Sequence, residues 1–313
     1  MIPGLILRGV GGAYWIHETN GRVTAAKPRG IFRRRRLSPL PGDRVLCSES
    51  GDDDFPYTIE EIKPRRNALV RPPVANLERC FITVALADPL PDFELVDKLG
   101  IICRIHNIEP LIVWTKTDLA PEALAGHRAQ YLATGWPQFA ASLEEQPVSC
   151  LLAEINGHLV SFAGASGTGK STLTNALLGE EVMEAGEISE KLGRGRHTTR
   201  HVELFRAGEG WICDTPGFSS LELDQLGILP EETILGYPEF EIHASGCRFP
   251  GCRHIQEPDC AVRRVVCDHP ELNPRYERYI LFRELLEAQE PWQLRRRREL
   301  LPPPGLPMST DRF

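Results

Sequence analysis

The central part of the sequence reads Gly164-Ala165-Ser166-Gly167-Thr168-Gly169-Lys170-Ser171, which matches the phosphate-loop pattern G-x-x-x-x-G-K-[ST]. An apolar run, residues 159–163, precedes the loop, and helically spaced apolar residues follow it. Glycines let backbone N–H groups turn inward around phosphate oxygens, and a helix N-terminus adds positive potential. An incidental glycine-rich turn is the alternative. The flanking strand and helix patterns favour a nucleotide-binding α/β domain.

Each position of this loop has a predicted role. Lys170 is expected to reach the β- and γ-phosphates and to be catalytic, and the Ser171 hydroxyl is expected to ligate Mg²⁺. The nucleotide-binding residues predicted for this segment are Gly164, Ala165, Ser166, Gly167, Thr168, Gly169, Lys170, Ser171 and Thr172.

A second motif, Asp214-Thr215-Pro216-Gly217, follows the apolar run at 211–213. A carboxylate at a strand end can hold the Mg²⁺ shell, and the Gly217 N–H can meet the γ-phosphate. Between this motif and the phosphate loop lies a segment rich in Gly and Arg, in which Thr198 or Thr199 is expected to complete the Mg²⁺ shell as a switch. An ordinary turn and a mobile surface loop are the alternatives for these two segments.

A third motif, Thr115-Lys116-Thr117-Asp118, follows the apolar run at 111–114 and is similar to the guanine-reading N-K-x-D pattern. The carboxylate of Asp118 can accept from guanine N1–H and N2–H₂, donors that adenine lacks, and the Lys116 stem can lie along the purine. Thr115 stands where Asn is usual. We expect this change to affect affinity more than base identity. The run Ala141-Ser142 is the candidate for a second base loop.

The order of the motifs is informative. In Ras-type GTPases the phosphate loop comes first and N-K-x-D last, whereas here the base reader precedes the phosphate loop. A circularly permuted G domain explains this order without changing the sheet. The segment after Asp214 then leads directly into the C-terminal region, which nucleotide state can move mechanically.

Metal-ligand spacing is present near the C-terminus. The pattern is Cys247-x₄-Cys252-x-His254-x₅-Cys260, three thiols and one imidazole. Such a set suits one structural Zn²⁺ in closed tetrahedral coordination, with no position left for water. Two buried thiols and a surface histidine are the alternative. Five further cysteines are expected in the core: Cys47, Cys80, Cys103, Cys150 and Cys213.

Composition limits the class of protein. Hydrophobic residues make up 42% and charged residues 25%, which excludes a wholly disordered chain, a collagen and a coiled-coil rod. No apolar run approaches the roughly 20 residues that span a bilayer, and the N-terminus lacks the pattern of a secretory signal. Nine cysteines without an export signal indicate reduced thiols or metal. We therefore expect a cytoplasmic protein with no membrane partner.

The domain organisation follows from changes along the chain. Short strands with Gly, Pro and Asn turns, among them the hairpin signal Asn20-Gly21, predict a small all-β barrel or sandwich at the N-terminus. Residues 275–300 show helical spacing, with an apolar stripe formed by Tyr279, Phe282, Leu285 and Leu286. The predicted units are a barrel (1–68), a G domain (69–223), a zinc domain with a C-terminal helix (224–300) and a disordered tail (301–313).

With these motifs together, the chain closely resembles the RsgA (YjeQ) family of bacterial small-subunit-dependent GTPases. The resemblance rests on the permuted order, on residues 164–171, 197–199 and 214–217, and on the spacing of the Cys/His cluster, and residues 71–76 look like the family's junction. It implies an N-terminal OB-fold, a permuted P-loop G domain and a zinc domain. It also implies that GTP is the substrate, and that hydrolysis during late 30S maturation is stimulated by the particle.

Two further expectations concern mechanism and partner. Phe218 stands where Ras-type enzymes have a water-orienting Gln, so we expect slow intrinsic hydrolysis, with His197 as the candidate that positions water and Thr199 as a further catalytic residue. His197 as a solvated loop residue is the equal alternative. The 30S subunit and its 16S rRNA are the expected partners, and DNA is not. A monomer is expected.

Basic residues are the candidates for RNA contact despite the net charge of −7, because binding responds to local potential. A first group, Arg29 and residues 33–36, is expected in a loop of the barrel. A second group of arginines surrounds the predicted metal ligands. Arg295 to Arg298 suit a solvated tail. The candidates are Arg29, Arg33, Arg34, Arg35, Arg36, Arg248, Arg253, Arg263 and Arg264.

Two other functions fit parts of the sequence. One is a nucleotide-gated RNA-binding module that does not hydrolyse the nucleotide, which measured turnover separates from an enzyme. The other is a P-loop ATPase or small-molecule kinase. Asp118 argues against the latter, and competition of GTP against ATP decides between them.

Overall fold

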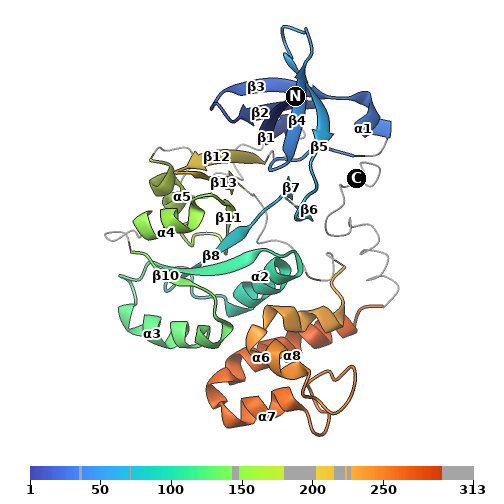
Figure 1. Cartoon of the computed structure of the whole chain (residues 1–313). Coiled ribbons are helices and arrows are strands. Elements are labelled where there is room, and N and C mark those ends of the chain that lie inside the picture. Colours follow the sequence, from blue (N-terminus) through green and yellow to red (C-terminus); the bar gives the residue numbers. More distant parts are fainter. Residues whose placement is uncertain are drawn as a thin grey trace.

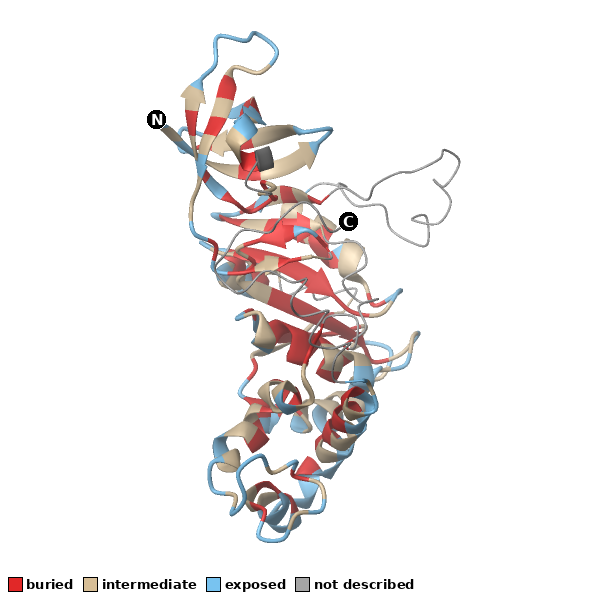
Figure 2. Cartoon of the chain, turned by 90° about the vertical axis from the view of Figure 1, so that its right-hand side faces the viewer, coloured by how far each residue is buried: buried red, intermediate tan, exposed pale blue. Residues whose placement is uncertain are grey.

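The computed structural model describes residues 1–34, 37–70, 72–142, 148–179, 202–214, 223 and 227–290 of the chain. Three parts follow one another along an elongated molecule (Figure 1). A β-barrel lies at one end, a central sheet with helices lies in the middle, and a group of helices lies at the other end. Buried residues concentrate in the strands of the central sheet (Figure 2).

The N-terminal part is a closed five-stranded barrel, as the resemblance implied. Its strands are β1 (Ile2–Val10), β2 (Ala13–Glu18), β3 (Val23–Pro28), β4 (Arg44–Glu49) and β5 (Tyr57–Ile62). They pair in the order β1-β2-β3-β5-β4, and β4 closes on β1. Inward-facing apolar residues such as Ile6, Ile16 and Ile59 fill the barrel. The predicted hairpin turn joins β2 to β3, with Gly21 at φ +87°.

The central sheet has the strand order β10-β9-β8-β11-β13-β12. Five strands are parallel to their neighbours, namely β8 (Arg79–Ala85), β9 (Glu109–Thr115), β10 (Gln138–Ala140), β11 (Leu159–Ala163) and β13 (Gly210–Asp214). Strand β12 (Glu203–Ala207), which the sequence patterns did not predict, runs antiparallel to β13. A chain that started at β11 and ended at β10 would form the same sheet, so the permuted arrangement is confirmed.

Helices cover both faces of this sheet. Helix α2 (Phe93–Ile105) lies on one face with η1 (Leu132–Thr134) nearby, and α4 (Val148–Ile155) and α5 (Lys170–Leu178) lie on the other. Helix α3 (Pro121–Ala129) has no buried residues. Cys150 is exposed, contrary to the expectation, because α4 turns Leu151 and Ile155 inward. The other four cysteines expected in the core are buried.

The barrel and the central sheet are continuous. Arg8 of β1 pairs with Glu203 of β12, so the two sheets form one of eleven strands. A short hairpin, β6 (Ala68–Leu69) with β7 (Val74–Ala75), lies at the same joint, and α1 (Gly30–Arg34) flanks the barrel. A Cβ on Gly42 would lie 2.0 Å from the Ala75 carbonyl oxygen. Only glycine therefore allows this approach of barrel loop to hairpin.

The C-terminal part consists of helices, two of which, η5 (Pro230–Gly236) and α8 (Asn273–Glu287), pack on α2. The others are α6 (Pro238–Ala244), α7 (Ala261–Asp268) and η6 (Pro270–Leu272). Within the predicted helical range 275–300, α8 ends at Glu287 and residues 288–290 are not helical, while residues 291–300 lie outside the described part of the chain. Leu285 is 44% exposed, whereas Tyr279, Phe282 and Leu286 are buried. At about 100° per residue, Tyr279, Phe282 and Leu286 lie within about 60° of one another around the helix, whereas Leu285 lies about a further 60° away.

Candidate nucleotide site and metal cluster

The phosphate loop connects β11 to α5, as its sequence predicted. Gly164, Gly167 and Gly169 have φ values of +144°, +79° and +85°, conformations that side chains rarely adopt. Ser166 and Gly167 are exposed, while Lys170, Ser171 and Thr172 form the first turn of α5. The loop therefore presents backbone N–H groups and a helix N-terminus to one space, which is how proteins bind phosphates.

Lys170 is held within this loop. Its ammonium donates hydrogen bonds to the carbonyl oxygens of Gly164, at 3.0 Å, and Ala165, at 2.7 Å. Burial lowers the pKa of Lys170, because the charged form is desolvated. A phosphate oxygen is a stronger acceptor than a peptide carbonyl, so this ammonium can exchange these contacts for a bound phosphate.

The base-reading motif begins at the end of β9. Lys116 has φ +54°, and its ammonium donates to the Asp88 carbonyl oxygen. Asp118 is exposed two residues later. The backbone N–H and hydroxyl of Thr117 both donate to the carbonyl oxygen of Ala141, at 3.2 and 3.1 Å. The candidate second base loop thus lies directly against the base reader.

Thr115 is turned into the protein. Its side chain is buried, and its hydroxyl donates a 2.8 Å hydrogen bond to the Thr168 carbonyl oxygen, 53 residues along the chain. The parallel strands β9, β8 and β11 end at the same edge of the sheet, which brings the two motifs together. The two motifs therefore lie in contact at one edge of the sheet in spite of their reversed order.

Asp214 lies at the same edge, at the end of β13 and directly opposite Glu203 of β12. Burial, with a smaller contribution from the Glu203 carboxylate, raises the pKa of Asp214. A carboxylate in this position favours a bound cation. The other residues predicted for Mg²⁺, γ-phosphate and water lie outside the described residues; they are His197, Thr198, Thr199, Thr215, Pro216, Gly217 and Phe218.

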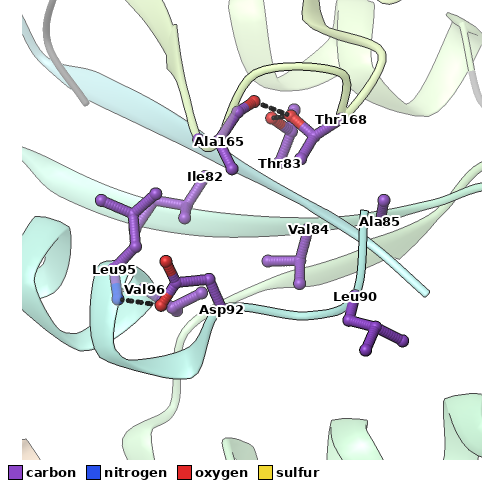
Figure 3. Close-up of a pocket in the computed structure, with 11 residues that line it drawn as sticks. Ile82, Thr83, Val84, Ala85, Leu90, Asp92, Leu95, Val96, Ala165 and Thr168 are labelled. Carbon is purple, nitrogen blue, oxygen red and sulfur yellow. Dashed lines mark hydrogen bonds between the residues drawn. The ribbon is translucent and has the colours of Figure 1, made fainter. Parts of the chain in front are cut away.

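A small pocket adjoins the phosphate loop (Figure 3). It is lined by Thr83 and neighbouring residues of β8, by Leu90 and Asp92 before α2, and by Ala165 and Thr168 of the loop. The Asp92 carboxylate accepts from the Leu95 N–H at 2.9 Å and so caps α2. Thr83 is a site residue that sequence patterns missed, because a threonine within a buried strand carries no motif.

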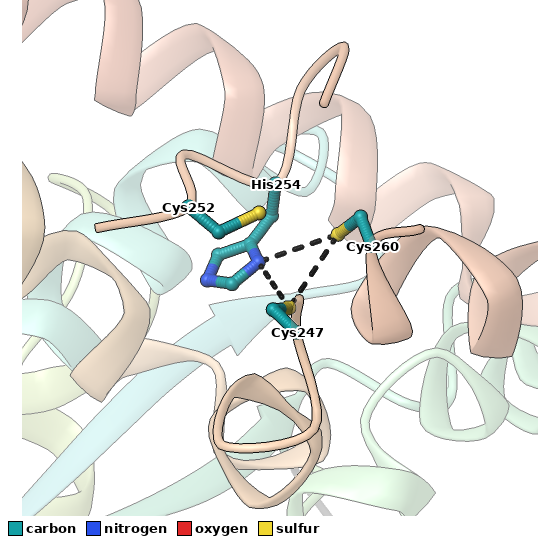
Figure 4. Close-up of side chains that lie close together, drawn as sticks. All are labelled: Cys247, Cys252, His254 and Cys260. Atoms are coloured by element: carbon teal, nitrogen blue, oxygen red, sulfur yellow. Dashed lines mark hydrogen bonds between the residues drawn. The ribbon is translucent and has the colours of Figure 1, made fainter. Parts of the chain in front are cut away.

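The Cys/His cluster is assembled (Figure 4). One ligand atom from each of Cys247, Cys252, His254 and Cys260 lies within 4.8 Å of all the others. The sulfur atoms of Cys247 and Cys260 are 3.8 Å apart, and His254 Nδ1 is 3.4 Å from each of them. A tetrahedral ion with metal–sulfur bonds of about 2.3 Å separates two sulfur ligands by about 3.8 Å. The four side chains therefore fit a tetrahedral metal ion.

Residues outside the ligand pattern hold the metal loop in shape. The Glu257 carboxylate accepts from the backbone N–H groups of Arg253, Ile255 and Gln256 at 3.0–3.2 Å. Burial of this carboxylate opposes its ionisation, but the N–H donors dominate and hold its pKa at about 2. Tyr276 of α8 donates to the His254 carbonyl oxygen at 2.6 Å. The ligand spacing in the sequence did not indicate these supports.

Together, the sheet order and the two joined motifs define a P-loop GTPase with a circularly permuted G domain. The model of the RsgA GTPase family matches residues 62–224, and the model of the RsgA N-terminal domain matches residues 3–54. The chain belongs to the RsgA GTPase family, and its activity is the hydrolysis of GTP. An ATPase or kinase function and a module without hydrolysis are thereby set aside.

Relatives match nearly the whole chain. The small ribosomal subunit biogenesis GTPase RsgA of Moorella thermoacetica is 42% identical over 92% of this chain and 99% of its own length. The protein of the same name from Ruminiclostridium cellulolyticum is 41% identical over 88% and 91%. The crystal structure of YloQ, a circularly permuted GTPase, superposes with a TM-score of 0.79 at 30% identity, covering 93% of this chain and 96% of that one. YjeQ from Thermotoga maritima superposes with a TM-score of 0.78 at 27% identity, covering 92% and 99%.

No helix within the described ranges is both long enough and apolar enough to cross a bilayer.

Proposed function

We propose that the chain is a small ribosomal subunit biogenesis GTPase, which binds the 30S subunit and hydrolyses GTP late in its maturation. The particle stimulates the hydrolysis. The observation that carries this proposal is the extent of the match, since relatives with that name align with all three parts of the chain. The protein acts in the cytoplasm as a monomer, with 16S rRNA as its contact on the particle.

In this proposal the nucleotide lies across the edge of the sheet. Asp118 and Lys116 serve the base, Thr115 lies behind them against the phosphate loop, residues 164–172 hold the phosphates, and Asp214 joins Ser171 around Mg²⁺. The remaining assigned residues are Thr198 and Gly217 for the metal and γ-phosphate, Lys170 and Thr199 for charge in the transition state, and His197 for the attacking water. The Mg²⁺ ion neutralises phosphate charge when it is bound.

The metal of the Cys/His cluster is one structural Zn²⁺ ion. Three thiolates and one imidazole are ligands that Zn²⁺ prefers, and four protein ligands close its tetrahedral shell. The ion cross-links the loop before α7 to the start of that helix. Its contribution is to folding, since no ligand position remains for water.

RNA contact is assigned to the barrel (1–68) and the zinc domain (224–300), which flank the G domain (69–223). Several of the basic candidates are already paired: Arg29 with Glu60, Arg248 with Asp259 and Arg253 with Glu287. Arg263 and Arg264 are exposed on α7, and Arg264 has no ion-pair partner within the described ranges. These two are the zinc-domain candidates for phosphate contact, while Arg35, Arg36 and Arg295 to Arg298 lie outside the described residues. If affinity for the 30S subunit hardly changes as salt rises, phosphate contact is not the basis of binding.

The test is nucleotide hydrolysis with GTP and with ATP, each with and without purified 30S subunits. We expect slow GTP hydrolysis alone, a large acceleration by 30S subunits, and little hydrolysis of ATP in either case. A rate that 30S subunits leave unchanged would contradict the proposed partner. His197→Ala in single-turnover reactions with 30S subunits tests the water-positioning role, and a variant as fast as wild type would remove it.

A further inference from the structure

Thr168 occupies a position of the phosphate-loop pattern that admits any residue. In the structure it is buried, 3% exposed, between the exposed Gly167 and the half-buried Gly169. Its hydroxyl lies 2.8 Å from the Thr83 hydroxyl on β8 and 2.9 Å from the Ala165 carbonyl oxygen (Figure 3). Its own carbonyl oxygen accepts from the Thr115 hydroxyl at 2.8 Å. Side chains of two adjacent strands thus meet the loop at a single residue.

The strand pattern explains why both hydroxyls point there. Alternate residues of a strand share a face, and Phe81 of β8 and Val113 of β9 belong to the apolar core that also contains Leu173 of α5. Thr83 and Thr115 lie two residues further along the same strands. They therefore reach the α5 side of the sheet at the edge where the phosphate loop turns into that helix.

We propose that Thr83, Thr115 and Thr168 form a threonine brace that sets the spacing between the phosphate loop and the base reader. The proposal deepens the proposed nucleotide site and rests on it. Thr115 then acts as a positioning residue in the place where the guanine-reading pattern has Asn, and its hydroxyl serves the loop in place of the base. Its neighbours Lys116 and Asp118 are held at a constant distance from Lys170 as a result.

The start of the loop shows how closely the brace is packed. A Cβ on Gly164 would lie 2.3 Å from the Thr83 carbonyl oxygen and 2.5 Å from its hydroxyl. The Thr83 hydroxyl is also 3.0 Å from the Ala163 carbonyl oxygen at the end of β11. Strand β8 therefore holds the loop at its first glycine and at its fifth residue, so the loop cannot shift as a unit along the sheet.

The Thr83 and Thr168 hydroxyls can also keep the loop hydrogen-bonded both with and without a bound phosphate. Each hydroxyl has one proton, so Thr83 and Thr168 have two arrangements. While Lys170 donates to the Ala165 carbonyl oxygen, Thr168 can donate to Thr83, and Thr83 to Ala163. When Lys170 turns to a phosphate, Thr168 can donate to Ala165 instead, and Thr83 to Thr168. The Ala165 carbonyl oxygen keeps a donor in both states, and the loop keeps its shape.

The experiment removes one hydroxyl at a time and preserves side-chain shape. Thr83→Val, Thr115→Val and Thr168→Val are compared with the matched serine variants, by titration with fluorescent GDP. We expect each valine variant to bind about five- to hundredfold more weakly, because a buried polar group loses its partner, and each serine variant to bind within about threefold of wild type. Wild-type affinity in all three valine variants would overturn the brace.

A second nucleotide separates positioning from direct base contact at Thr115. The diphosphate of 2-aminopurine riboside lacks the guanine 6-oxygen and also the N1–H from which Asp118 accepts, so the comparison is the fold-change between wild type and Thr115→Val for each nucleotide. If Thr115 acts through the loop, Thr115→Val weakens GDP and this analogue by the same factor. A loss confined to GDP would show that Thr115 contacts the base and would refute its role in the brace.

One control variant separates a failure of the proposed base reader from a failure of the threonine brace. Asp118→Asn should shift preference from guanosine to xanthosine diphosphate, because an amide can donate to the xanthine 2-oxygen. If that shift is absent, the proposed base reader is wrong. If the shift is present while the valine variants bind normally, only the brace is wrong.

Hydrogen exchange at the amides of residues 164–170 gives a second readout for the brace. Thr168→Val should speed exchange there, and exchange as slow as in wild type would count against the brace.

Discussion

Arg278 of α8 donates a 2.6 Å hydrogen bond to the Asp97 carboxylate of α2, although 181 residues separate the two. Asp97 is completely buried and also accepts from Arg275 and from the Tyr131 hydroxyl. Arg275 in turn contacts Glu239, so the buried Arg275 and the partly exposed Arg278 face two buried carboxylates. This network joins the G domain to the metal-binding part of the chain, through the helix that begins beside the phosphate loop.

Asp97→Ala is expected to destabilise the protein strongly. Removing this carboxylate leaves the partly exposed Arg278, and part of the charge of the buried Arg275, without a partner, and breaking a buried pair typically costs about 3–5 kcal/mol. Urea unfolding measures the loss. Glu94→Ala, on the exposed face of the same helix, is the control and should change stability by less than about 1 kcal/mol. Equal stability of the two variants would show that the network is not what holds α8 to α2.

Removing one metal ligand should release the metal and disorder the loop around it. Cys260→Ser replaces a thiolate by a weaker ligand, so we expect bound zinc, measured by elemental analysis, to fall well below one per chain. Proteolysis should then cut between α6 and α7. Cys267→Ser is the matched control, since Cys267 is exposed and lies outside the cluster. Full zinc content in Cys260→Ser would rule out the four-ligand site.

Asp214→Asn should stabilise the nucleotide-free protein while abolishing Mg²⁺-dependent hydrolysis. The pKa of Asp214 is raised by burial and by Glu203, so the folded state disfavours its charged form. This penalty is absent below the ordinary pKa of 3.8, grows as pH rises from 3.8 towards the raised value, and is complete above that value. Thermal unfolding in EDTA should therefore show a larger gain at pH 7 than at pH 4, close to the ordinary pKa. The exposed Glu209→Gln is the control, and a gain independent of pH would contradict the stated cause.

Two glycines test the joint between barrel and G domain. Gly42 (φ +89°) and Gly51 (φ +75°) have similar backbone conformations, but only Gly42 has a neighbour where a Cβ would lie. Gly51→Ala should therefore cost only the backbone strain, about 1 kcal/mol, whereas Gly42→Ala should cost clearly more because the Ala75 carbonyl must move. Urea unfolding compares the two. Equal losses would mean that this close approach contributes little to the joint.

Sequence patterns predicted where the motif residues lie, but they did not predict the side chains that hold those motifs in place. The phosphate-loop sequence joins β11 to α5, Asp214 ends β13, and the side chains of Cys247, Cys252, His254 and Cys260 lie close together, as their motifs predicted. Such motifs are contiguous, so covalent geometry keeps their residues together. The patterns failed at Cys150 and Leu285, because the face of a helix that turns inward depends on what packs against it. They also missed β12, whose pairing depends on β13 and β1.

The amino-acid order alone determined that the G domain is permuted, and it predicted which residues bind phosphate, guanine and metal. Only the tertiary structure shows which long-range contacts hold those residues in place. Thr83 and Thr115 bond to Thr168, Asp97 pairs with two arginines, and Arg8 pairs with Glu203. The physical reason is the distance along the chain over which each kind of interaction acts. A ligand pattern acts over a few covalent bonds, whereas these contacts join residues from 53 to 195 positions apart, and only the packed chain brings such groups within hydrogen-bonding distance.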